Sequence, residues 1–158
     1  DVKPENFLIS YSGEVKVCDF GLARDKHKTR MNTVNMGGTL LYVAPEVHRG
    51  QAFDEGCDVY AFAIVLWELV TLGRPFDDKP EQAIPGIVGW GAERPTLETL
   101  NKMKSEKLNS EEGKSLEILS QAIEGGWVQD PSARWSMEMV HGRISDTLGI
   151  LHDEAGEV

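Results

Sequence analysis

The apolar positions of this 158-residue chain fall into short runs, and the longest run predicts a buried helix. Residues 58–72 (DVYAFAIVLWELVTL) would be apolar on nearly every side of a helix. Asp54 and Glu55, just before the run, are acids that favour a helix start, and Gly73 with Pro75 after it form a typical helix stop. With about 15 residues and acids inside it, the segment is too short to span a membrane. We therefore expect the central helix of a globular core.

Weaker helical patterns follow in the second half of the chain. Residues 81–88 have a faint helical pattern, and residues 114–125 (KSLEILSQAIEG) carry apolar residues at intervals of three and four. A last helix is expected from about Ser136 to Leu148. These segments predict a mainly α fold.

One β-hairpin is expected near the N-terminus. Two short β-prone runs, Phe7–Ile9 and Val15–Val17, are separated by a polar stretch that contains Gly13. At the open end of this hairpin we expect Asn6 and Asp19 to face each other. An amide oxygen and a carboxylate held side by side form half of a site for Mg²⁺, which prefers hard oxygen ligands.

Composition and charge narrow the possible functions. The chain has 26 acidic residues against 16 Lys and Arg, a net charge of −10, which argues against binding nucleic acid through a basic surface. The two cysteines form no metal-ligand pattern and make a disulfide framework unlikely, so a reducing, cytoplasmic location is expected. Nothing in the composition indicates a second domain, a repeat or a membrane segment.

Three motifs follow one another in the first 46 residues: Asp1-Val2-Lys3-Pro4-Glu5-Asn6, Asp19-Phe20-Gly21 and Ala44-Pro45-Glu46. Alone, they would be read as a solvated loop, a turn and a helix start. In this order and at these separations they resemble the catalytic half of a eukaryotic protein kinase. The resemblance implies the C-terminal lobe of the protein-kinase-like fold over residues 1–149, with the hairpin carrying the catalytic and DFG loops, and an acidic tail at 150–158.

The same resemblance implies that part of the kinase domain lies outside this chain. The Gly-rich loop, the phosphate-binding Lys and its partner Glu would all precede residue 1, so the N-lobe is expected to be absent. The fragment alone is therefore expected to bind nucleotide weakly and to be inactive.

Catalytic roles can be assigned by this resemblance. Asp1 would accept the proton of the substrate hydroxyl, and Lys3 would place a positive charge on the γ-phosphate of ATP. Asn6 and Asp19 would hold the Mg²⁺ ions that accompany ATP. Thr39 would hydrogen-bond Asp1 and Lys3, a simple turn hydroxyl being the alternative.

Regulatory and structural roles follow from the same comparison. The polar segment 22–43 resembles an activation loop, with Thr33 and Thr29 as candidate phosphorylation sites and Arg24 as the phosphate contact; its basic residues are otherwise an ordinary solvated face. A buried ion pair is expected between Glu46 and Arg134. Asp58 would support the backbone of the catalytic loop.

The kind of kinase is also indicated. Lys3-Pro4-Glu5 resembles the serine/threonine kinases rather than the tyrosine kinases. Trp67-Glu68 with Thr71-Leu72-Gly73, and the tryptophan turn at 127–131, are similar to the tyrosine-kinase-like group of Ser/Thr kinases. Two positions depart from the family pattern, because Gly126 replaces a frequent cysteine and Trp135 a frequent proline.

The expected function is ATP-dependent phosphoryl transfer to Ser or Thr hydroxyls of protein substrates. The acidic lobe and Glu5 favour substrates with basic residues near the acceptor, although a solvated Glu is the simpler interpretation. Two alternatives remain, a non-catalytic pseudokinase that acts as a scaffold and an incomplete gene product without function. Retention of Asp1, Lys3, Asn6 and Asp19 argues against the pseudokinase.

Overall fold

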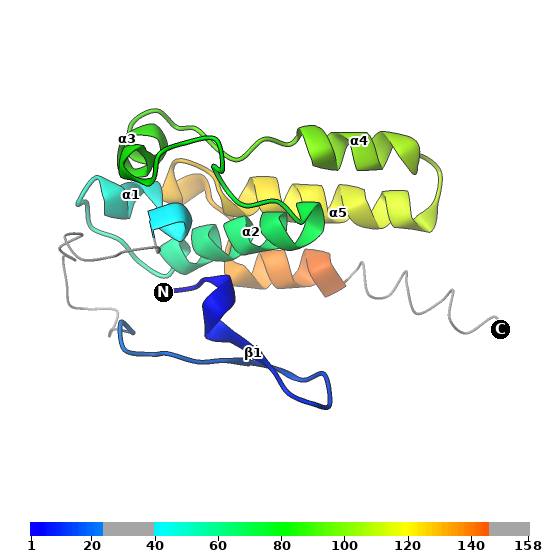
Figure 1. The fold of residues 1–158 in the computed structure, drawn as a ribbon, viewed down its shortest axis with the longest axis horizontal. Helices are drawn as coiled ribbons and strands as arrows, with labels where there is room; N and C mark the ends of the chain where they lie inside the picture. Colours follow the sequence, from blue (N-terminus) through cyan, green and yellow to red (C-terminus); the bar gives the residue numbers. More distant parts are fainter. Residues whose placement is uncertain (24–39, 146–158) are drawn as a thin grey trace.

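The computed structural model describes residues 1–23 and 40–145, and within them the chain is mainly helical with one two-stranded hairpin (Figure 1). The mainly α fold with one β-hairpin that the sequence predicts is confirmed. Residues 137–145 also form a helix. The other elements are β1 (Phe7–Ile9), β2 (Val15–Val17), α1 (Pro45–His48), α2 (Gly56–Thr71), α3 (Ile84–Gly89), α4 (Glu98–Glu106) and α5 (Glu111–Gly126).

Helix α2 is the centre of the core, as its apolar sequence predicts. Eight of its residues are buried, and Tyr60 and Ile64 have no exposed surface. It packs against α5, against α4 and against the short turn Leu40–Tyr42. The helix ends because Leu72 adopts a left-handed conformation, with φ of 55°, immediately before Gly73.

Helix α4 is not expected from the sequence, and α5 begins earlier than expected. Only Leu100 of α4 is buried, so its own apolar pattern is weak; contact with α5 stabilises it, including an ion pair between Lys104 and Glu117 at 3.2 Å. Helix α5 starts at Glu111 because the hydroxyl of Ser110 accepts a hydrogen bond from the Gly113 N–H at 3.0 Å, which caps the first turn. Both features depend on tertiary contacts or on a cap rather than on periodicity.

The hairpin is antiparallel, but its register places different residues at the open end from those expected. Phe7 pairs with Val17, so Asn6 lies opposite Cys18, whose N–H donates to the Asn6 carbonyl at 2.9 Å. Asp19 is one residue beyond this pair, where a φ of 58° turns the chain away from the ladder. The expected direct pairing of Asn6 with Asp19 is therefore wrong by one residue.

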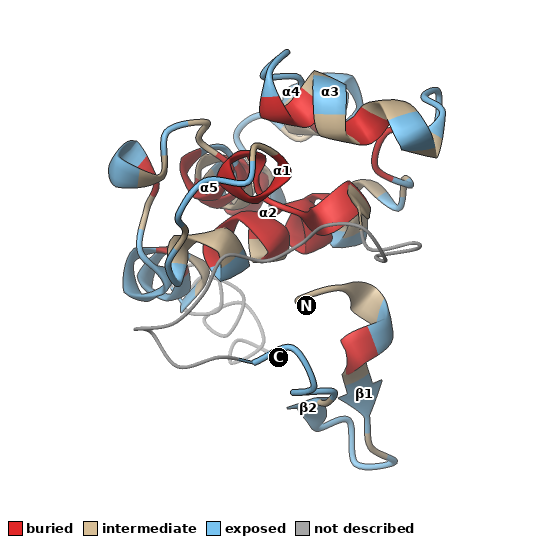
Figure 2. Ribbon diagram, turned by 90° about the vertical axis from the view of Figure 1, so that its left-hand side faces the viewer, coloured by how far each residue is buried: buried red, intermediate tan, exposed pale blue. Residues whose placement is uncertain are grey.

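Burial divides the described residues into a helical body and an exposed hairpin. Figure 2 shows the buried residues gathered on α1, α2 and α5, whereas β1 and β2 are exposed along most of their length. None of the helices in these two ranges has the length and apolar character needed to cross a bilayer. The expected helix to Leu148 is described only to residue 145, and the tail at 150–158 lies outside the described residues.

Candidate active site

Asp1, Lys3 and Asn6 form a buried polar cluster at the start of the chain. A short turn, Pro4–Asn6, folds Asn6 back so that its Nδ2 donates to the Asp1 carbonyl at 2.7 Å and lies 3.4 Å from Asp1 Oδ2. Lys3 Nζ lies 2.6 Å from the same Oδ2. The Asp1 side chain is 7% exposed and Asn6 is buried. One carboxylate oxygen is thus fixed by a cation and an amide.

The second carboxylate oxygen of this cluster has no donor among residues 1–23 and 40–145. Asp1 Oδ1 is buried and makes no hydrogen bond with these residues. A buried acceptor without a donor is costly, on the order of 1–3 kcal/mol for a polar group. A hydroxyl group that approached this oxygen would therefore be favourably bound as a donor.

Asp19 is hydrogen-bonded within its own turn. It is exposed, and its Oδ1 accepts a hydrogen bond from the Gly21 N–H at 3.1 Å. Among residues 1–23 and 40–145, no hydrogen bond joins the side chain of Asp19 to Asp1 or Asn6. Its second oxygen accepts no hydrogen bond from the residues that the structure describes.

The donor set of Asn6 and Asp19 fits Mg²⁺. Asn6 uses its NH₂ group on Asp1, and its amide oxygen accepts no hydrogen bond from the described residues. No group of three or more His, Cys, Asp or Glu in the described part of the chain could hold a metal. Mg²⁺ usually takes one or two protein oxygens and keeps water or phosphate oxygens in its other positions. Asn6 and Asp19 suit that mode.

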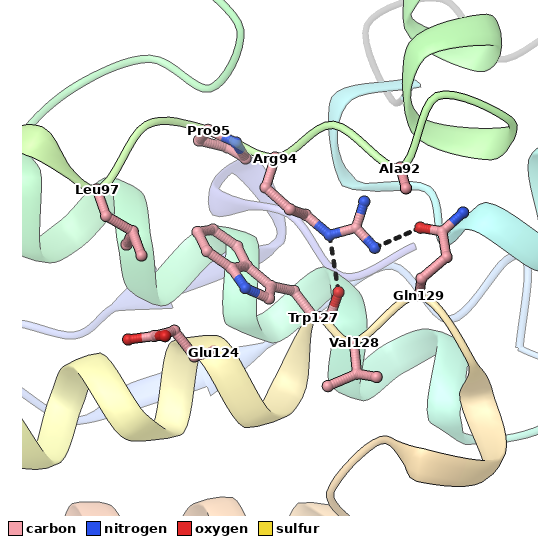
Figure 3. A pocket seen from close by; sticks show the side chains of 8 residues that line it. All are labelled: Ala92, Arg94, Pro95, Leu97, Glu124, Trp127, Val128 and Gln129. Carbon is pink, nitrogen blue, oxygen red and sulfur yellow. Dashed lines mark hydrogen bonds between the residues drawn. The ribbon is translucent and has the colours of Figure 1, made fainter.

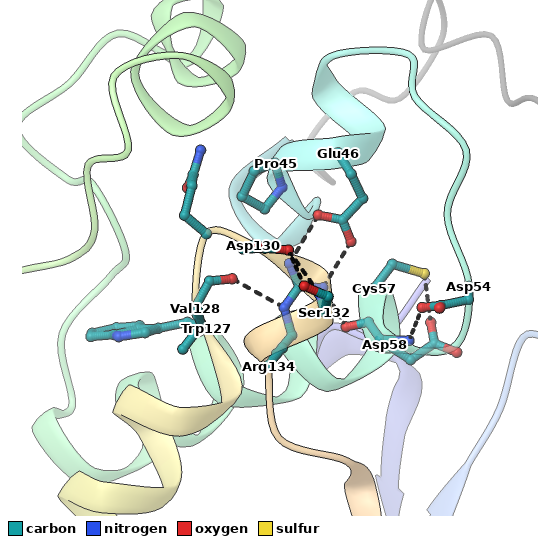
Figure 4. A network of polar contacts seen from close by, with 12 residues as sticks. Pro45, Glu46, Asp54, Cys57, Asp58, Trp127, Val128, Asp130, Ser132 and Arg134 are labelled. Atoms are coloured by element: carbon teal, nitrogen blue, oxygen red, sulfur yellow. Dashed lines mark hydrogen bonds and ion pairs between the residues drawn. The ribbon is translucent and has the colours of Figure 1, made fainter.

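Glu46 and Arg134 form a bidentate buried ion pair (Figure 4). Arg134 Nη1 lies 2.7 Å from Glu46 Oε1, Nη2 lies 2.9 Å from Oε2, and the two side chains are 0% and 2% exposed. The same guanidinium donates to the carbonyls of Gly56 at 2.7 Å and Val128 at 3.1 Å, and lies 5.4 Å from the ring centre of Tyr60. Arg134 therefore connects three parts of the lobe through its hydrogen bonds: α1, the start of α2 and the segment after α5.

Asp58, the expected support of the catalytic loop, lies at the start of α2. It lies exposed in the first turn of α2, and its carboxylate accepts a weak hydrogen bond from Cys57 Sγ at 3.8 Å (Figure 4). Within the described residues, no hydrogen bond connects Asp58 to the loop of Asp1. The remaining site candidates, Arg24, Thr29, Thr33 and Thr39, lie outside the described residues.

The structure also shows a polar pair that the sequence reasoning missed. Tyr42 is buried, and its hydroxyl donates to Glu68 Oε2 of α2 at 2.7 Å. Burial raises the pKa of Tyr42 above its ordinary value, and the hydrogen bond to Glu68 and the charge of Glu5 raise it further. An acid inside an otherwise apolar helix was the available signal, because such an acid needs a partner.

The comparisons with known proteins agree on one family, the protein kinases. The model of the protein kinase domain family matches residues 1–143. The probable serine/threonine-protein kinase SIS8 of Arabidopsis thaliana is 43% identical over 90 residues, which are 57% of this chain and 9% of that protein. The serine/threonine-protein kinase CTR1 of the same plant is 33% identical over 140 residues, 89% of this chain and 15% of that protein.

A human relative gives similar coverage. Mitogen-activated protein kinase kinase kinase 7 of Homo sapiens is 35% identical over 143 residues, 89% of this chain and 21% of that protein. The chain thus spans between 9% and 21% of the length of these three relatives. The resemblance to Ser/Thr kinases nearest to the tyrosine-kinase-like group, inferred from the sequence, is confirmed. With its family model matched over residues 1–143, the chain belongs to the protein kinase domain family.

Proposed function

We propose that this chain provides the catalytic lobe for ATP-dependent transfer of a phosphoryl group to Ser or Thr hydroxyls of protein substrates. The observation that carries the proposal is the buried Asp1 carboxylate, held through Oδ2 by Lys3 while Oδ1 has no donor in the part of the chain that the structure describes. This arrangement stands in a chain whose residues 1–143 match the protein kinase domain family.

Asp1 would take up the proton of the substrate hydroxyl, and Lys3 would supply part of the positive charge that the transfer requires. Phosphoryl transfer depends mainly on positioning and charge neutralisation, because the protein takes little part in covalent chemistry. Asp1 Oδ1 accepts the proton of the substrate hydroxyl, and the ion pair with Lys3 at 2.6 Å keeps the carboxylate oriented. The Lys3 ammonium also adds positive charge next to the reacting oxygen.

Asn6 and Asp19 would hold Mg²⁺ with ATP. The amide oxygen of Asn6 and the second carboxylate oxygen of Asp19, neither bonded by a described residue, are the hard donors proposed for this purpose. When bound, the metal neutralises the negative charge that the phosphate groups carry. Exposure of Asp19 leaves it accessible to a nucleotide from solvent.

The activation segment would complete and regulate this site. Thr39 is proposed to hydrogen-bond Asp1 and Lys3, which would connect the substrate-binding segment to the catalytic loop. Thr33, or Thr29 in its place, is proposed as the phosphorylation site, with Arg24 as a contact for the phosphate.

An N-lobe of the same kinase is the proposed partner of the hairpin. Leu8, Ile9, Val15 and Val17 are each more than half exposed, from 52% to 74%. A two-stranded hairpin is marginally stable in water unless another element packs against it. The apolar side chains of β1 and β2 therefore support a covering lobe, and ATP would lie between that lobe and Asp19.

Substrates with basic residues near the acceptor hydroxyl are proposed. Glu5 is exposed and close enough to raise the pKa of Tyr42, whose hydroxyl is bonded to Glu68. Two acids and one cation, Arg74, thus act on this tyrosine, which leaves an excess of negative charge there in a chain with a net charge of −10. A basic side chain would be attracted to this position.

The test is phosphoryl transfer by the full natural polypeptide that contains residues 1–158. We expect Mg²⁺-dependent incorporation of the γ-phosphate of ATP into Ser and Thr, identified by phosphoamino acid analysis of a mixed protein substrate. Asp1→Asn should lower kcat by at least about 100-fold, because the general base is lost.

Glu98→Gln is the matched control for that substitution, because Glu98 is exposed in α4 and should leave kcat unchanged. Absence of transfer by the wild-type polypeptide, with binding of Mg·ATP retained, would instead favour the scaffold. Transfer mainly to Tyr would contradict the assignment to Ser and Thr.

A further inference from the structure

Helix α4 is attached to the rest of the lobe through little buried apolar surface. Of its nine residues, all of which the structure describes, Leu100 alone is buried. Helix α5 buries seven of its residues, and α2 buries eight. Elements with few buried apolar contacts open more readily than the core on which they lie. Of these three helices, α4 is therefore the one expected to open first.

Polar contacts with α5 hold the second half of α4. Lys104 Nζ lies 3.2 Å from Glu117 Oε2 and donates to Ser120 Oγ at 3.1 Å. Ser120 is 1% exposed, and its hydroxyl donates in turn to Glu124 Oε1 at 2.9 Å. Glu117, Ser120 and Glu124 follow one another at intervals of three and four, so they lie along one face of α5. Lys104 thus places one positive charge over a polar stripe.

The chain is fixed by hydrogen bonds on both sides of α4. Before the helix, Arg94 Nε donates to the Trp127 carbonyl at 2.7 Å (Figure 3). After the helix, the Lys107 carbonyl accepts hydrogen bonds from the Ser110 N–H at 3.0 Å and from the Ser110 hydroxyl at 2.8 Å. Residues 97–106 therefore lie between two fixed points, and we call this segment the strap.

Opening of the strap would release mainly groups that water can satisfy. Lys104 and Ser120 would each exchange a partner in the protein for water, and such an exchange changes the free energy little. Leu100 is the one fully buried apolar side chain that the strap would expose, since Leu97 and Met103 are only partly buried. The contact of Lys104 with α5 therefore makes up a large part of what keeps the strap closed.

We propose that the strap opens locally while α2 and α5 stay folded, and that Lys104 is the contact that keeps it closed. In the closed form, Lys104 joins α4 to Glu117 and Ser120. In the open form, the face of α5 that carries Ser120 meets solvent. A ligand that binds only this face would favour the open form, so the strap is a point at which the lobe can be controlled. The inference does not depend on the proposed phosphoryl transfer, because no residue assigned to that reaction lies in 97–106.

Hydrogen–deuterium exchange of the full natural polypeptide, read by mass spectrometry, distinguishes local from global opening. The reporters are the backbone amides of 101–106, the first of which is the Asn101 N–H, bonded to the Leu97 carbonyl at 2.8 Å. We expect their protection factors to be at least about 100-fold lower than those at the centres of α2 and α5. Urea below the unfolding transition should hardly change exchange in 101–106, because local opening exposes little surface, and should accelerate exchange in α2 steeply.

Two lysines of α4 provide a matched pair of substitutions. Lys104→Gln removes the charge next to Glu117 and should accelerate exchange in 101–106 about fivefold or more. Lys102 is 75% exposed and lies 3.9 Å from Glu106 of the same helix, so Lys102→Gln should leave exchange within about twofold of the wild type. Exchange in 101–106 as slow as in α5, with the same urea dependence, would show that α4 opens only with the core and would overturn the proposal. Equal effects of the two substitutions would overturn the role of Lys104.

Discussion

Arg134 shows how a single residue can carry much of the stability of this lobe. It pairs with Glu46 and donates to two backbone carbonyls, with no exposed side-chain surface. Glu46→Gln keeps the shape of the side chain and leaves the Arg134 charge buried without its counter-ion. We expect the free energy of unfolding to fall by about 3–5 kcal/mol, measured by urea denaturation. Glu98→Gln should change it by less than about 0.5 kcal/mol, and a similar small change for Glu46→Gln would show that water reaches the pair.

Because of the buried His48, we expect the folded protein to be less stable in acid. His48 is buried in α1, and among the described residues its ring nitrogens make no hydrogen bond of good geometry, the approach to the Leu40 carbonyl being only a weak one. Burial lowers the pKa of His48 from 6.5 to about 4, although the Leu40 carbonyl and the Glu46 carboxylate act in the opposite direction. The folded state therefore holds a neutral imidazole, while the unfolded chain takes up a proton near its ordinary pKa. Stability is fully present above about pH 6.5 and falls as the pH decreases toward 4.

The comparison of His48→Leu with the wild type measures this effect. Urea denaturation at several pH values should show that the wild type loses roughly 3 kcal/mol more than His48→Leu between about pH 7 and pH 4. His141 is exposed, so His141→Leu should leave the pH dependence as it is in the wild type. Parallel pH profiles for the wild type and His48→Leu would mean that His48 is protonated in the folded state.

At the residue scale, the sequence was informative where partners are close in the chain. Asp1, Lys3 and Asn6 lie within one short turn, so local geometry alone brings them together. Tyr42 and Glu68 meet across two elements, the turn Leu40–Tyr42 and α2. Tertiary placement of this kind leaves no periodic signal in the sequence.

At the element scale, close packing explains both positions that depart from the family pattern, Gly126 and Trp135. A Cβ on Gly126 would lie 2.8 Å from Ala63 Cβ of α2, so the cysteine frequent at this position would not fit without movement. A Cβ on Gly125 would lie 2.3 Å from the ring of Trp135, which packs on this glycine and donates its backbone N–H to the Gly125 carbonyl at 3.0 Å. Gly126 thus permits close packing of α5 on α2, and Trp135 covers the adjacent glycine.

Substitution of Gly126 tests this close packing. Gly126→Ala should destabilise the protein by about 1–3 kcal/mol in thermal or urea unfolding, because overpacking forces α2 and α5 apart. Gly142 is the matched control, since it is exposed in the helix at 137–145 and a Cβ there would meet no atom within 4 Å. Gly142→Ala should be stabilising by about 0.5–1 kcal/mol, because alanine is the better helix former. Effects of the same sign at both glycines would contradict the packing argument.

Elements with a strong period were predictable, and those without one were not. Helix α2 and the strand pair are evident from their apolar runs, and α5 from its intervals of three and four. Helix α4 has two lysines, two glutamates and three uncharged polar residues among its nine, so its existence depends on Leu100 and on contacts with α5. The register error at Asp19 has a similar origin, because a left-handed residue after β2 is not visible in an apolar pattern.

At the scale of the whole molecule, two surface properties oppose each other. The hairpin exposes apolar side chains, with Ile9 74% and Val15 58% exposed in directly paired positions. Exposed apolar strands favour pairing with another chain. The net charge of −10 repels a second copy, and this repulsion weakens when salt shortens its range. Self-association of the chain should therefore increase with ionic strength.

Sedimentation velocity at increasing protein concentration can separate these two effects. We expect the weight-average sedimentation coefficient to rise more steeply when NaCl is increased from about 0.05 M to about 0.5 M, because the Debye length falls several-fold. The double variant Ile9→Thr with Val15→Thr keeps β-prone residues but removes apolar surface, so its sedimentation coefficient should depend less on concentration at both salt levels. Leu108 is 73% exposed outside the hairpin, and Leu108→Thr should behave as the wild type. If the double variant associates as strongly as the wild type, the contact lies on another surface, and the exposed hairpin loses its role as the site of association.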